Sequence, residues 1–536
     1  MKKATPLLFI LLLLTGFLMG AFFTGMLTGT PTGYKENGKL EEVLGYIDNE
    51  YVDNVDMDSL IEKSLPKIIQ ELDPHSVYIP KDEVDAMTSD LQSSFSGIGV
   101  RFTIQDDTIN ISDVIRGGPS ESAGVLAGDK IITVNDTLFV GKDVCTNDNA
   151  MKKLKGPKGS FVTLGLQRFG EKEPVKIRIR RDDIMVESIE AAYLIDNKWG
   201  YIQIERFAEN TYYEFVQAII TLAEGDLQGL ILDLRGNGGG YMGVAIEMAN
   251  QFLDAGDLIV YTEGESCPTQ MEEANGYGQL KDIPIVVLVD ETSASASEII
   301  AGTIQDNDRG MVIGRRTFGK GLVQRQIDLK DGSMIRLTIA RYHTPSGRCI
   351  QKPYTNGDAE SYGMDLIDRY NRGEFFSQDS IHQNEELIYK TKNGRTVFGG
   401  GGIMPDIFVS SDTTNVTDYA QDVISKGILA QFTLKYSNAY RHRLSHLKSY
   451  DALIGELEKR DMVGELINFA RKRGIEPDNT QIATSRELLK RAIYSNMIYQ
   501  LQGMLEHVKY INLDDSTVLK AVEVLESGKA FPTPGE

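Results

Sequence analysis

Cysteine and histidine are scarce in this chain of 536 residues, which contains three cysteines and six histidines. The cysteines stand far apart in the sequence, at Cys145, Cys267 and Cys349. This spacing offers neither a disulfide framework nor a zinc ribbon. His442 and His446 have the spacing of the HExxH zinc motif, but Arg443 occupies the position of its catalytic glutamate. We therefore interpret the two histidines as part of a surface helix, and we expect no metal site.

Positive charge is also in short supply. The chain has 56 Lys and Arg against 77 Asp and Glu, a formal net charge of −21. Binding to nucleic-acid phosphates requires clustered basic side chains, so we expect no nucleic-acid partner. Apolar residues make up 41% of the chain, which excludes a disordered protein and allows buried cores. The length predicts two to four domains.

Only one hydrophobic run is long enough to cross a membrane. Lys2 and Lys3 precede the uncharged stretch 7–27, which would span about 30 Å as a helix. The run is longer than the apolar region of a signal peptide, and no clear Ala-x-Ala site follows it. We favour an uncleaved inner-membrane anchor within residues 1–30 over a cleaved signal. Both alternatives place the remaining chain in the cell envelope, on the periplasmic or extracytoplasmic side, because the two lysines stay in the cytoplasm.

Two regions follow this segment before the centre of the chain. Residues 31–92 have helical periodicity, which predicts a small helical bundle or a dimerisation arm, and with the latter a homo-oligomer. Residues 93–182 contain five short β-type runs separated by turn residues. This pattern predicts a compact, β-rich module.

The second half of the sequence divides into a mixed region and a helical one. Residues 183–412 alternate strand and helix patterns, and continuous apolar runs such as 283–289 predict strands covered on both faces. This is typical of an α/β layered core. Within it, residues 353–385 are polar and predict an inserted loop region. Residues 413–536 have a charged, helical pattern, which predicts a helical extension.

A turn of small residues between a strand and a helix is the first candidate for chemistry. Ser-Ala-Ser-Ala-Ser at 293–297 follows the apolar strand 283–289. Small side chains let the backbone approach closely and expose one hydroxyl, and a helix N-terminus supplies free amide donors for an oxyanion. Serine is also a preferred helix cap, so this segment alone leaves a plain N-cap open.

One lysine stands in an apolar setting. Lys320 lies between Gly319 and Gly321, with Phe318 and Leu322 beyond them. Burial among apolar groups lowers the pKa of a lysine toward neutrality, as a general base requires. The alternative is a solvated turn residue, because lysine is rarely buried.

A glycine-rich loop, Arg-Gly-Asn-Gly-Gly-Gly at 235–240, follows a third apolar strand. Such a loop can offer backbone N–H groups to an anion. Gly238, Gly240 and Gly243 also fit the dinucleotide motif G-x-G-x-x-G, but the match lacks its usual context at the start of a domain. The sequence contains no G-x-S-x-G elbow, which disfavours an α/β-hydrolase triad.

Together these segments resemble those of the carboxyl-terminal processing peptidases, or tail-specific proteases, which are serine–lysine enzymes with an embedded PDZ domain. The matching peptidase signatures are Ser-Ala-Ser-Ala-Ser-Glu at 293–298, Thr-Phe-Gly-Lys-Gly at 317–321 with Gln324, and Leu-Arg-x-Asn-x-Gly-Gly at 234–240. The PDZ signature is matched by Gly97-Ile98-Gly99-Val100 and by residues 118–129, and Leu72–Ser76 is similar to the family's segment before that domain. The resemblance covers residues 38–412.

The resemblance implies a role for each matching residue. Ser295 corresponds to the nucleophile, Lys320 to the general base and Gln324 to the residue that orients the lysine. The oxyanion hole would consist of the amides of Ala296 and Gly239. The loop Gly97–Val100 would bind the carboxylate of a substrate tail, and no metal or cofactor is needed.

The implied protein is a multidomain α/β serine endopeptidase, with an inserted PDZ domain at 93–182 in a peptidase core at 183–412. It would cleave exported polypeptides with free, apolar C-termini, in processing or quality control. Two other classes remain as alternatives: a catalytically silent PDZ scaffold or chaperone of the same fold, and a nucleotide-binding enzyme. The intact Ser295, Lys320 and Gln324 count against the silent scaffold.

Overall fold

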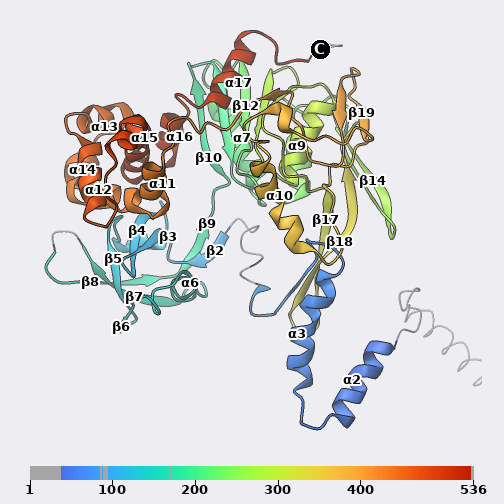
Figure 1. The fold of residues 1–536 in the computed structure, drawn as a ribbon, viewed down its shortest axis with the longest axis horizontal. Coiled ribbons are helices and arrows are strands. Elements are labelled where there is room, and N and C mark those ends of the chain that lie inside the picture. Colours follow the sequence, from blue (N-terminus) through green and yellow to red (C-terminus); the bar gives the residue numbers. More distant parts are fainter. Residues whose placement is uncertain (1–37, 85–86, 88–93, 169–170, 533–536) are drawn as a thin grey trace, which may run out of the picture. The chain divides into compact units, whose positions relative to one another are not determined.

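The computed structural model describes residues 38–84, 87, 94–168 and 171–532 (Figure 1). The predicted membrane anchor at 7–27 lies outside these residues and stays a prediction. Within the described ranges, no helix combines the length and the apolar character that a membrane span requires.

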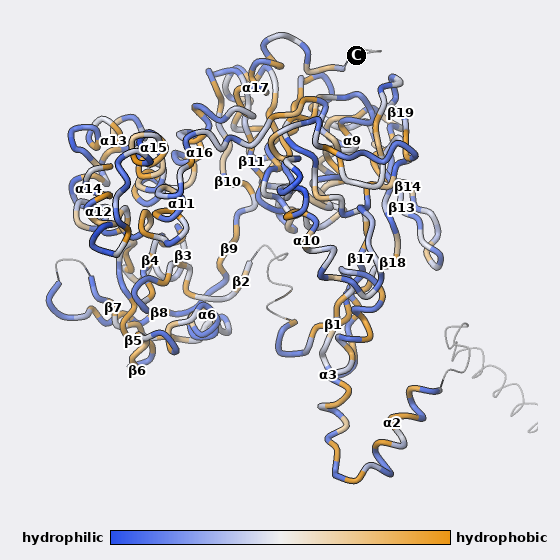
Figure 2. The backbone as a smooth tube through the Cα atoms, viewed as in Figure 1, coloured by the Kyte–Doolittle hydropathy of each residue, from blue (hydrophilic) through white to orange (hydrophobic). Residues whose placement is uncertain are grey.

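Two helices, α2 (Lys39–Glu50) and α3 (Met57–Gln70), form the N-terminal region. Apolar and polar residues alternate along both helices (Figure 2). None of their residues is fully buried, and Leu40 and Val43 are exposed. The helices lie in the region where the sequence predicted them.

The β-rich module is built on an antiparallel sheet. Its strands lie side by side in the order β3 (Val100–Gln105), β4 (Thr108–Val114), β5 (Lys130–Val134), β7 (Phe161–Gln167) and β8 (Val175–Arg180), with β6 (Thr137–Leu138) on β5. A separate pair joins β2 (Ser94–Gly97) to β9 (Asp182–Met185), and the helices are α5 (Pro119–Ala123) and α6 (Asn147–Leu154). Alternate residues of β4, Ile109 and Ile111, are fully buried in its core.

A six-stranded sheet forms the centre of the second half of the chain. Its order is β10 (Ile189–Ile195), β11 (Trp199–Ile204), β12 (Gly229–Asp233), β15 (Ile285–Val289), β16 (Met311–Gly314) and β21 (Ile407–Phe408). The first pair is antiparallel and the others are parallel. Every residue of β12 and β15 is buried, which explains their continuous apolar runs.

Helices cover both faces of this sheet. Leu230 and Val287 pack with α7 (Thr211–Ala223), α8 (Met242–Ala249) and α9 (Ala296–Asp306). The alternate residues Ile231 and Val286 pack on the opposite face with Val518 and other apolar residues of α17 (Ser516–Glu526). The C-terminal helix therefore completes the layered core, and the expected multidomain α/β fold is confirmed.

A second sheet carries part of the candidate site. Its strands follow the order β1 (Val77–Ile79), β18 (Met334–His343), β13 (Leu258–Gly264) and β14 (Cys267–Glu273), with β17 (Leu322–Asp328) also on β18. Strand β1 comes from the segment before the β-rich module and pairs antiparallel with residues 334–336. The sheet thus joins this early segment to the strand that follows Lys320.

The segment 353–385, predicted as a loop region, contains a helix, α10 (Ala359–Asn371). Asp358 caps it by accepting a hydrogen bond from the Ser361 amide at 3.0 Å. Of its side chains, only those of Tyr362 and Arg369 are buried. The apolar period is correspondingly weak, which is why the sequence pattern did not predict the helix. Short elements follow it: a 3₁₀ turn (Gln378–Ser380), β19 (Ile388–Lys390) and β20 (Thr396–Phe398).

The C-terminal region is helical, as the sequence predicted. Five helices, α11 (Asp418–Ser425), α12 (Ile428–Leu444), α13 (Tyr450–Leu457), α14 (Met462–Arg471) and α15 (Asn479–Gln502), enclose a core of their own. Leu453, Leu466, Leu489 and Ile493 are fully buried there. The next helix, α16 (Met504–Ile511), contributes Val508 to the far face of the central sheet.

Candidate active site

The three predicted motifs follow the carboxyl ends of adjacent parallel strands, β12, β15 and β16. In an open α/β sheet these ends meet at one edge, where ligand sites form. Direct contacts join the three loops. The Ala294 amide donates to the Asn237 carbonyl at 3.0 Å, and the Phe318 amide donates to the Ser293 carbonyl at 3.0 Å. The topology therefore brings the serine turn, the glycine loop and the lysine loop together.

The serine turn contains three serines, of which one is available for chemistry. The hydroxyl groups of Ser293 and Ser297 are fully buried and donate to the carbonyls of Leu234 (2.8 Å) and Asn237 (2.9 Å). Ser295 is partly exposed, and no described residue accepts a hydrogen bond from its hydroxyl. Its φ of +55° is rare for a residue with a side chain, and such strain clusters at functional sites.

The glycine loop packs directly against the serine turn. Gly239 has a φ of +102°, and a Cβ atom there would lie 2.7 Å from the Cβ of Ser295. This contact requires glycine. The predicted oxyanion donors differ in availability: the Gly239 amide donates to Asn237 Oδ1 at 2.8 Å, whereas the Ala296 amide has no acceptor among the described residues. In this conformation Gly239 cannot also donate to a substrate.

Glu298, fully buried in the first turn of α9, links the serine turn to the lysine loop. Its Oε1 accepts hydrogen bonds from Thr317 Oγ1 (2.5 Å) and the Gly319 amide (2.8 Å). Its Oε2 accepts from the amides of Ser295 (2.9 Å) and Lys320 (2.8 Å). Burial raises the pKa of Glu298 to about 7, against the lowering effect of these four bonds. Sequence analysis did not select this residue as part of the site.

The electrostatic surroundings of Lys320 suit a base. Burial lowers the pKa of its ammonium group and the charge of Arg336 lowers it further, while the carboxylates of Glu298 and Asp73 oppose the shift. In the described part of the chain, no hydrogen bond joins the Lys320 ammonium to the hydroxyl of Ser295. Catalytic hydrogen bonds are often long in structures without substrate and shorten when it binds.

Gln324, the third predicted member, lies on β17 beside the lysine. Lys320 Nζ donates to Gln324 Oε1 at 3.3 Å. Gln324 Nε2 in turn donates to the carbonyl of His75 at 2.7 Å. No group of three or more His, Cys, Asp or Glu side chains in the described ranges is placed to bind a metal ion.

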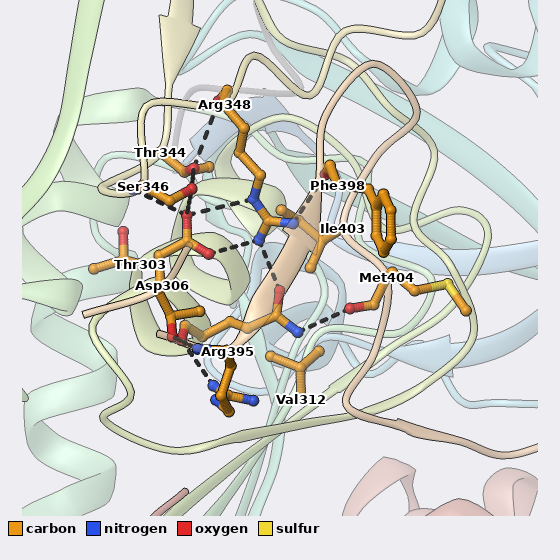
Figure 3. A network of polar contacts seen from close by, with 12 residues as sticks. Thr303, Asp306, Val312, Thr344, Ser346, Arg348, Arg395, Phe398, Ile403 and Met404 are labelled. Atoms are coloured by element: carbon orange, nitrogen blue, oxygen red, sulfur yellow. Dashed lines mark hydrogen bonds and ion pairs between the residues drawn. The ribbon is translucent and has the colours of Figure 1, made fainter. Parts of the chain in front are cut away.

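A buried ionic network fixes the far end of α9 (Figure 3). Arg348 donates to Asp306 Oδ1 at 2.7 Å and to Gln305 Oε1 at 2.7 Å, and the side chains of Arg348 and Asp306 are fully buried. Leaving one partner of such a pair uncompensated costs about 3–5 kcal/mol. The network therefore anchors the helix that carries Ser295 at its N-terminus.

The predicted substrate loop of the β-rich module lies between β2 and β3. Gly99 has a φ of +74°. The amides of Ile98 and Gly99 donate to no acceptor among the described residues, although their carbonyls accept from Ser120 (3.0 Å) and Ile115 (3.1 Å). The neighbouring strand β3 ends the sheet, so one of its edges is not paired with another strand of the described chain.

Family models match three separate parts of the chain. Residues 198–361 match the model of peptidase family S41, and residues 96–179 match that of the PDZ domain. Residues 419–503 match a family of unknown function.

Related proteins are named as proteases. A carboxy-terminal-processing protease of Bartonella bacilliformis is 36% identical over 59% of this chain and 73% of its own length. The carboxy-terminal processing protease CtpA of Bacillus subtilis (strain 168) is 33% identical over 73% of this chain and 87% of its own length. A solved photosystem II D1 C-terminal processing protease is 25% identical, with a TM-score of 0.35 over 70% of this chain and 94% of its own.

The matches to both bacterial proteases extend over more than two thirds of those proteins. The peptidase and PDZ matches fall on the α/β core and on the β-rich module described above. The chain therefore belongs to peptidase family S41, the carboxy-terminal processing serine proteases.

Proposed function

We propose that this chain is an endopeptidase that uses Ser295 as nucleophile and Lys320 as general base. The observation that carries the proposal is the partly exposed, strained Ser295, held beside the loop of the half-buried Lys320 by one carboxylate, Glu298. Oγ of Ser295 attacks the scissile carbonyl carbon while neutral Lys320 takes its proton. Lys320 then gives this proton to the departing amine as the C–N bond breaks. Water hydrolyses the acyl-enzyme, again with Lys320 as the base.

The oxyanion of each tetrahedral intermediate needs hydrogen-bond donors beside Ser295. The amide of Ala296 meets this requirement because it follows the nucleophile and lacks an acceptor among the described residues. A donor from the glycine loop would complete the hole. For Gly239 to be this donor, its amide must break its hydrogen bond to Asn237 Oδ1 and donate to the oxyanion instead.

The pH dependence of cleavage follows from the protonation states that Lys320 and Glu298 need for catalysis. Lys320 must be neutral, so cleavage should rise with pH through its lowered pKa. Glu298 must be ionised to accept four hydrogen bonds, and its pKa of about 7 adds to the same rise. We expect a rising limb in kcat/KM between mildly acidic and alkaline pH, measured with a fluorogenic peptide. A flat profile, with circular dichroism unchanged across the range, would contradict both assignments.

For substrate selection, we propose that the PDZ domain binds the free carboxylate of a substrate's C-terminus. The amides of Ile98 and Gly99, which have no acceptor among the described residues, provide donors. The edge of β3 that no described strand pairs with can bind the tail as an added strand. Val100, Phe102 and Ile104 of β3 are half-buried against the core of the module. An apolar terminal residue suits this surface.

Amidation of the C-terminus should therefore weaken binding. Full-length Ser295→Ala protein binds without cutting, so titration with a fluorescent peptide measures affinity directly. We expect the free acid with an apolar terminal residue to bind about tenfold or more tightly than the amidated peptide, because a hydrogen-bonded charge is lost. A peptide that ends in Asp should also bind less tightly. Equal affinities for all three peptides would remove tail recognition and leave the Ser295–Lys320 assignment intact.

For location, we propose that the enzyme acts on exported proteins in the cell envelope, with its N-terminal segment in the inner membrane. The support is the apolar stretch 7–27 after two lysines. A homo-oligomer through the N-terminal helices is part of the same proposal. Alkaline carbonate extraction of membranes, with the full chain and with a chain beginning at residue 31, tests the anchor: only the full chain should stay in the pellet.

A further inference from the structure

The motif Leu72–Ser76 has no role in the chemistry described so far, yet the structure places it beside the catalytic lysine. Asp73 and Ser76 are buried, with exposed fractions of 6% and 4%. The strand that follows, β1, pairs with β18. The motif therefore packs on the sheet whose strand β17 carries Gln324.

The carbonyl of His75 decides which way the Gln324 amide points. Gln324 Nε2 donates to this carbonyl at 2.7 Å, and Gln324 Oε1 accepts from Lys320 Nζ at 3.3 Å. A flipped amide would direct Nε2 at the ammonium and Oε1 at the carbonyl, which places donor against donor and acceptor against acceptor. The His75 carbonyl therefore keeps an acceptor directed at Lys320.

Asp73 holds this carbonyl in place. Its Oδ1 accepts from the amides of His75 (2.8 Å) and Ser76 (2.9 Å), which closes a tight turn. Thr338 of β18 donates to the same oxygen through its hydroxyl (3.1 Å) and to Ser76 Oγ through its amide (3.0 Å). Ser76 Oγ donates to Asp73 Oδ2 at 2.5 Å. One carboxylate thus fixes the turn internally and attaches it to the sheet.

The side chain of His75 contacts Tyr362 of α10. Its Nε2 lies 2.9 Å from the hydroxyl of Tyr362, which also accepts from Gln351 Nε2 at 3.2 Å. The tyrosine proton is therefore free to point at His75, as a neutral imidazole requires. Burial, together with the nearby charge of Lys320, lowers the pKa of His75 to about 4. The imidazole thus stays uncharged beside the catalytic lysine.

We propose that Asp73 is a positioning residue of the peptidase, which acts through the His75 carbonyl and Gln324 to hold the amine of Lys320 for proton transfer. The inference rests on the proposed role of Lys320 as the base. It assigns to the segment before the PDZ domain a part in catalysis, in addition to its packing on the sheet.

The charge of Asp73 should influence the pKa of Lys320, an effect that packing alone would not produce. Lys320 faces Arg336 of β18, Glu298 of α9, Asp73 and the neutral His75. Burial opposes ionisation of Asp73, but its hydrogen bonds hold its pKa below the ordinary value, so its negative charge is present throughout the assay range. Removing that charge takes away a group that stabilises the ammonium, which lowers the pKa of Lys320.

The test compares Asp73→Ala with Asp73→Asn in the full-length enzyme. The alanine variant loses the turn and should lower the plateau kcat about 10- to 100-fold with KM little changed, because a small displacement of a catalytic group is costly. The asparagine variant keeps an acceptor for the two amides and Thr338, and should recover most of the plateau rate. In both, the rising limb should move to lower pH. As the matched control, Asp331→Ala removes a similar turn contact to Ser333 at the far end of the same hairpin and should change neither rate nor limb.

A double-mutant cycle with Gln324→Ala separates positioning from general packing. If Asp73 acts through Gln324, then Asp73→Ala in the Gln324→Ala background should change the plateau kcat by less than about threefold. Additive losses would overturn the proposal. If Asp73→Ala does not fold, the pH–rate profile of Asp73→Asn is the test. A rising limb at the same pH as in the wild type would also overturn the proposed role of Asp73.

Lys320→Ala distinguishes failure of this inference from failure of the proposed function. An inactive Lys320→Ala, with Asp73→Ala equal to wild type in plateau and limb, removes only the role of Asp73. A Lys320→Ala variant that cleaves at the wild-type rate removes the base itself, and with it the reason to position that residue.

Discussion

Lys320→Arg is expected to lose cleavage of a fluorogenic peptide almost as completely as Lys320→Ala, although arginine keeps the positive charge. A guanidinium group stays protonated in proteins, so it cannot accept the proton of Ser295. Loss of a general base lowers kcat by about 10²- to 10⁴-fold. Arginine is also bulkier, and Lys320 Nζ already donates to Gln324 Oε1 at 3.3 Å. Initial rates at saturating peptide, with thermal unfolding of each variant, provide the measurement.

Lys352 supplies a matched control for this substitution. Lys352 is buried, burial lowers the pKa of its ammonium group as it does for Lys320, and this group pairs with Asp365 at 2.9 Å. Arginine can keep that ion pair, so Lys352→Arg should retain most of the activity. A Lys320→Arg variant that turns over at the wild-type rate would contradict the assignment of the base.

Ser295→Ala is expected to have the largest effect of any single substitution. Removal of the nucleophile of a serine protease lowers kcat by a factor on the order of 10⁶. The melting temperature should fall only slightly, because no described residue accepts a hydrogen bond from this hydroxyl and the loss is limited to its role as the N-cap of α9, about 1 kcal/mol. Peptide cleavage and thermal unfolding of the same preparation separate loss of chemistry from loss of fold.

Two neighbouring serines provide the controls. Ser293→Ala and Ser297→Ala each remove a buried hydrogen bond to a backbone carbonyl, which costs about 1–3 kcal/mol of stability. These variants should melt at lower temperature yet still cleave peptide while folded. Equal loss of turnover in all three variants would show that cleavage depends on the structure of the turn, and it would contradict the assignment of the Ser295 hydroxyl as the nucleophile.

Sequence patterns identified the local parts of the candidate site because each part is a short, continuous signature. The serine turn, the lysine loop and the glycine loop each follow an apolar strand, and adjacent parallel strands bring their carboxyl ends to one edge. The composition of each loop also reflects a physical need. Gly239, for example, must lack a side chain because of its contact with Ser295.

The tertiary partners of these parts could not be predicted in the same way. Glu298 reaches donors 19 to 22 positions later in the sequence, and Gln324 bonds to His75 across 249 positions. The hydrophobic periodicity of a sequence does not indicate which distant residues form hydrogen bonds. Helix α10 was missed because it buries few side chains. The role of α17 depends on its packing against the far face of the sheet.

The role of Ser295 as nucleophile is tested most directly by the mass of the enzyme after rapid acid quenching of its reaction with an activated peptide ester. We expect a mass increase equal to the acyl group, mapped by fragmentation to Ser295. The adduct should be absent in Ser295→Ala and should form far more slowly in Lys320→Ala. An adduct on another residue, or one that forms unchanged in Ser295→Ala, would contradict the assignment of Ser295 as the nucleophile.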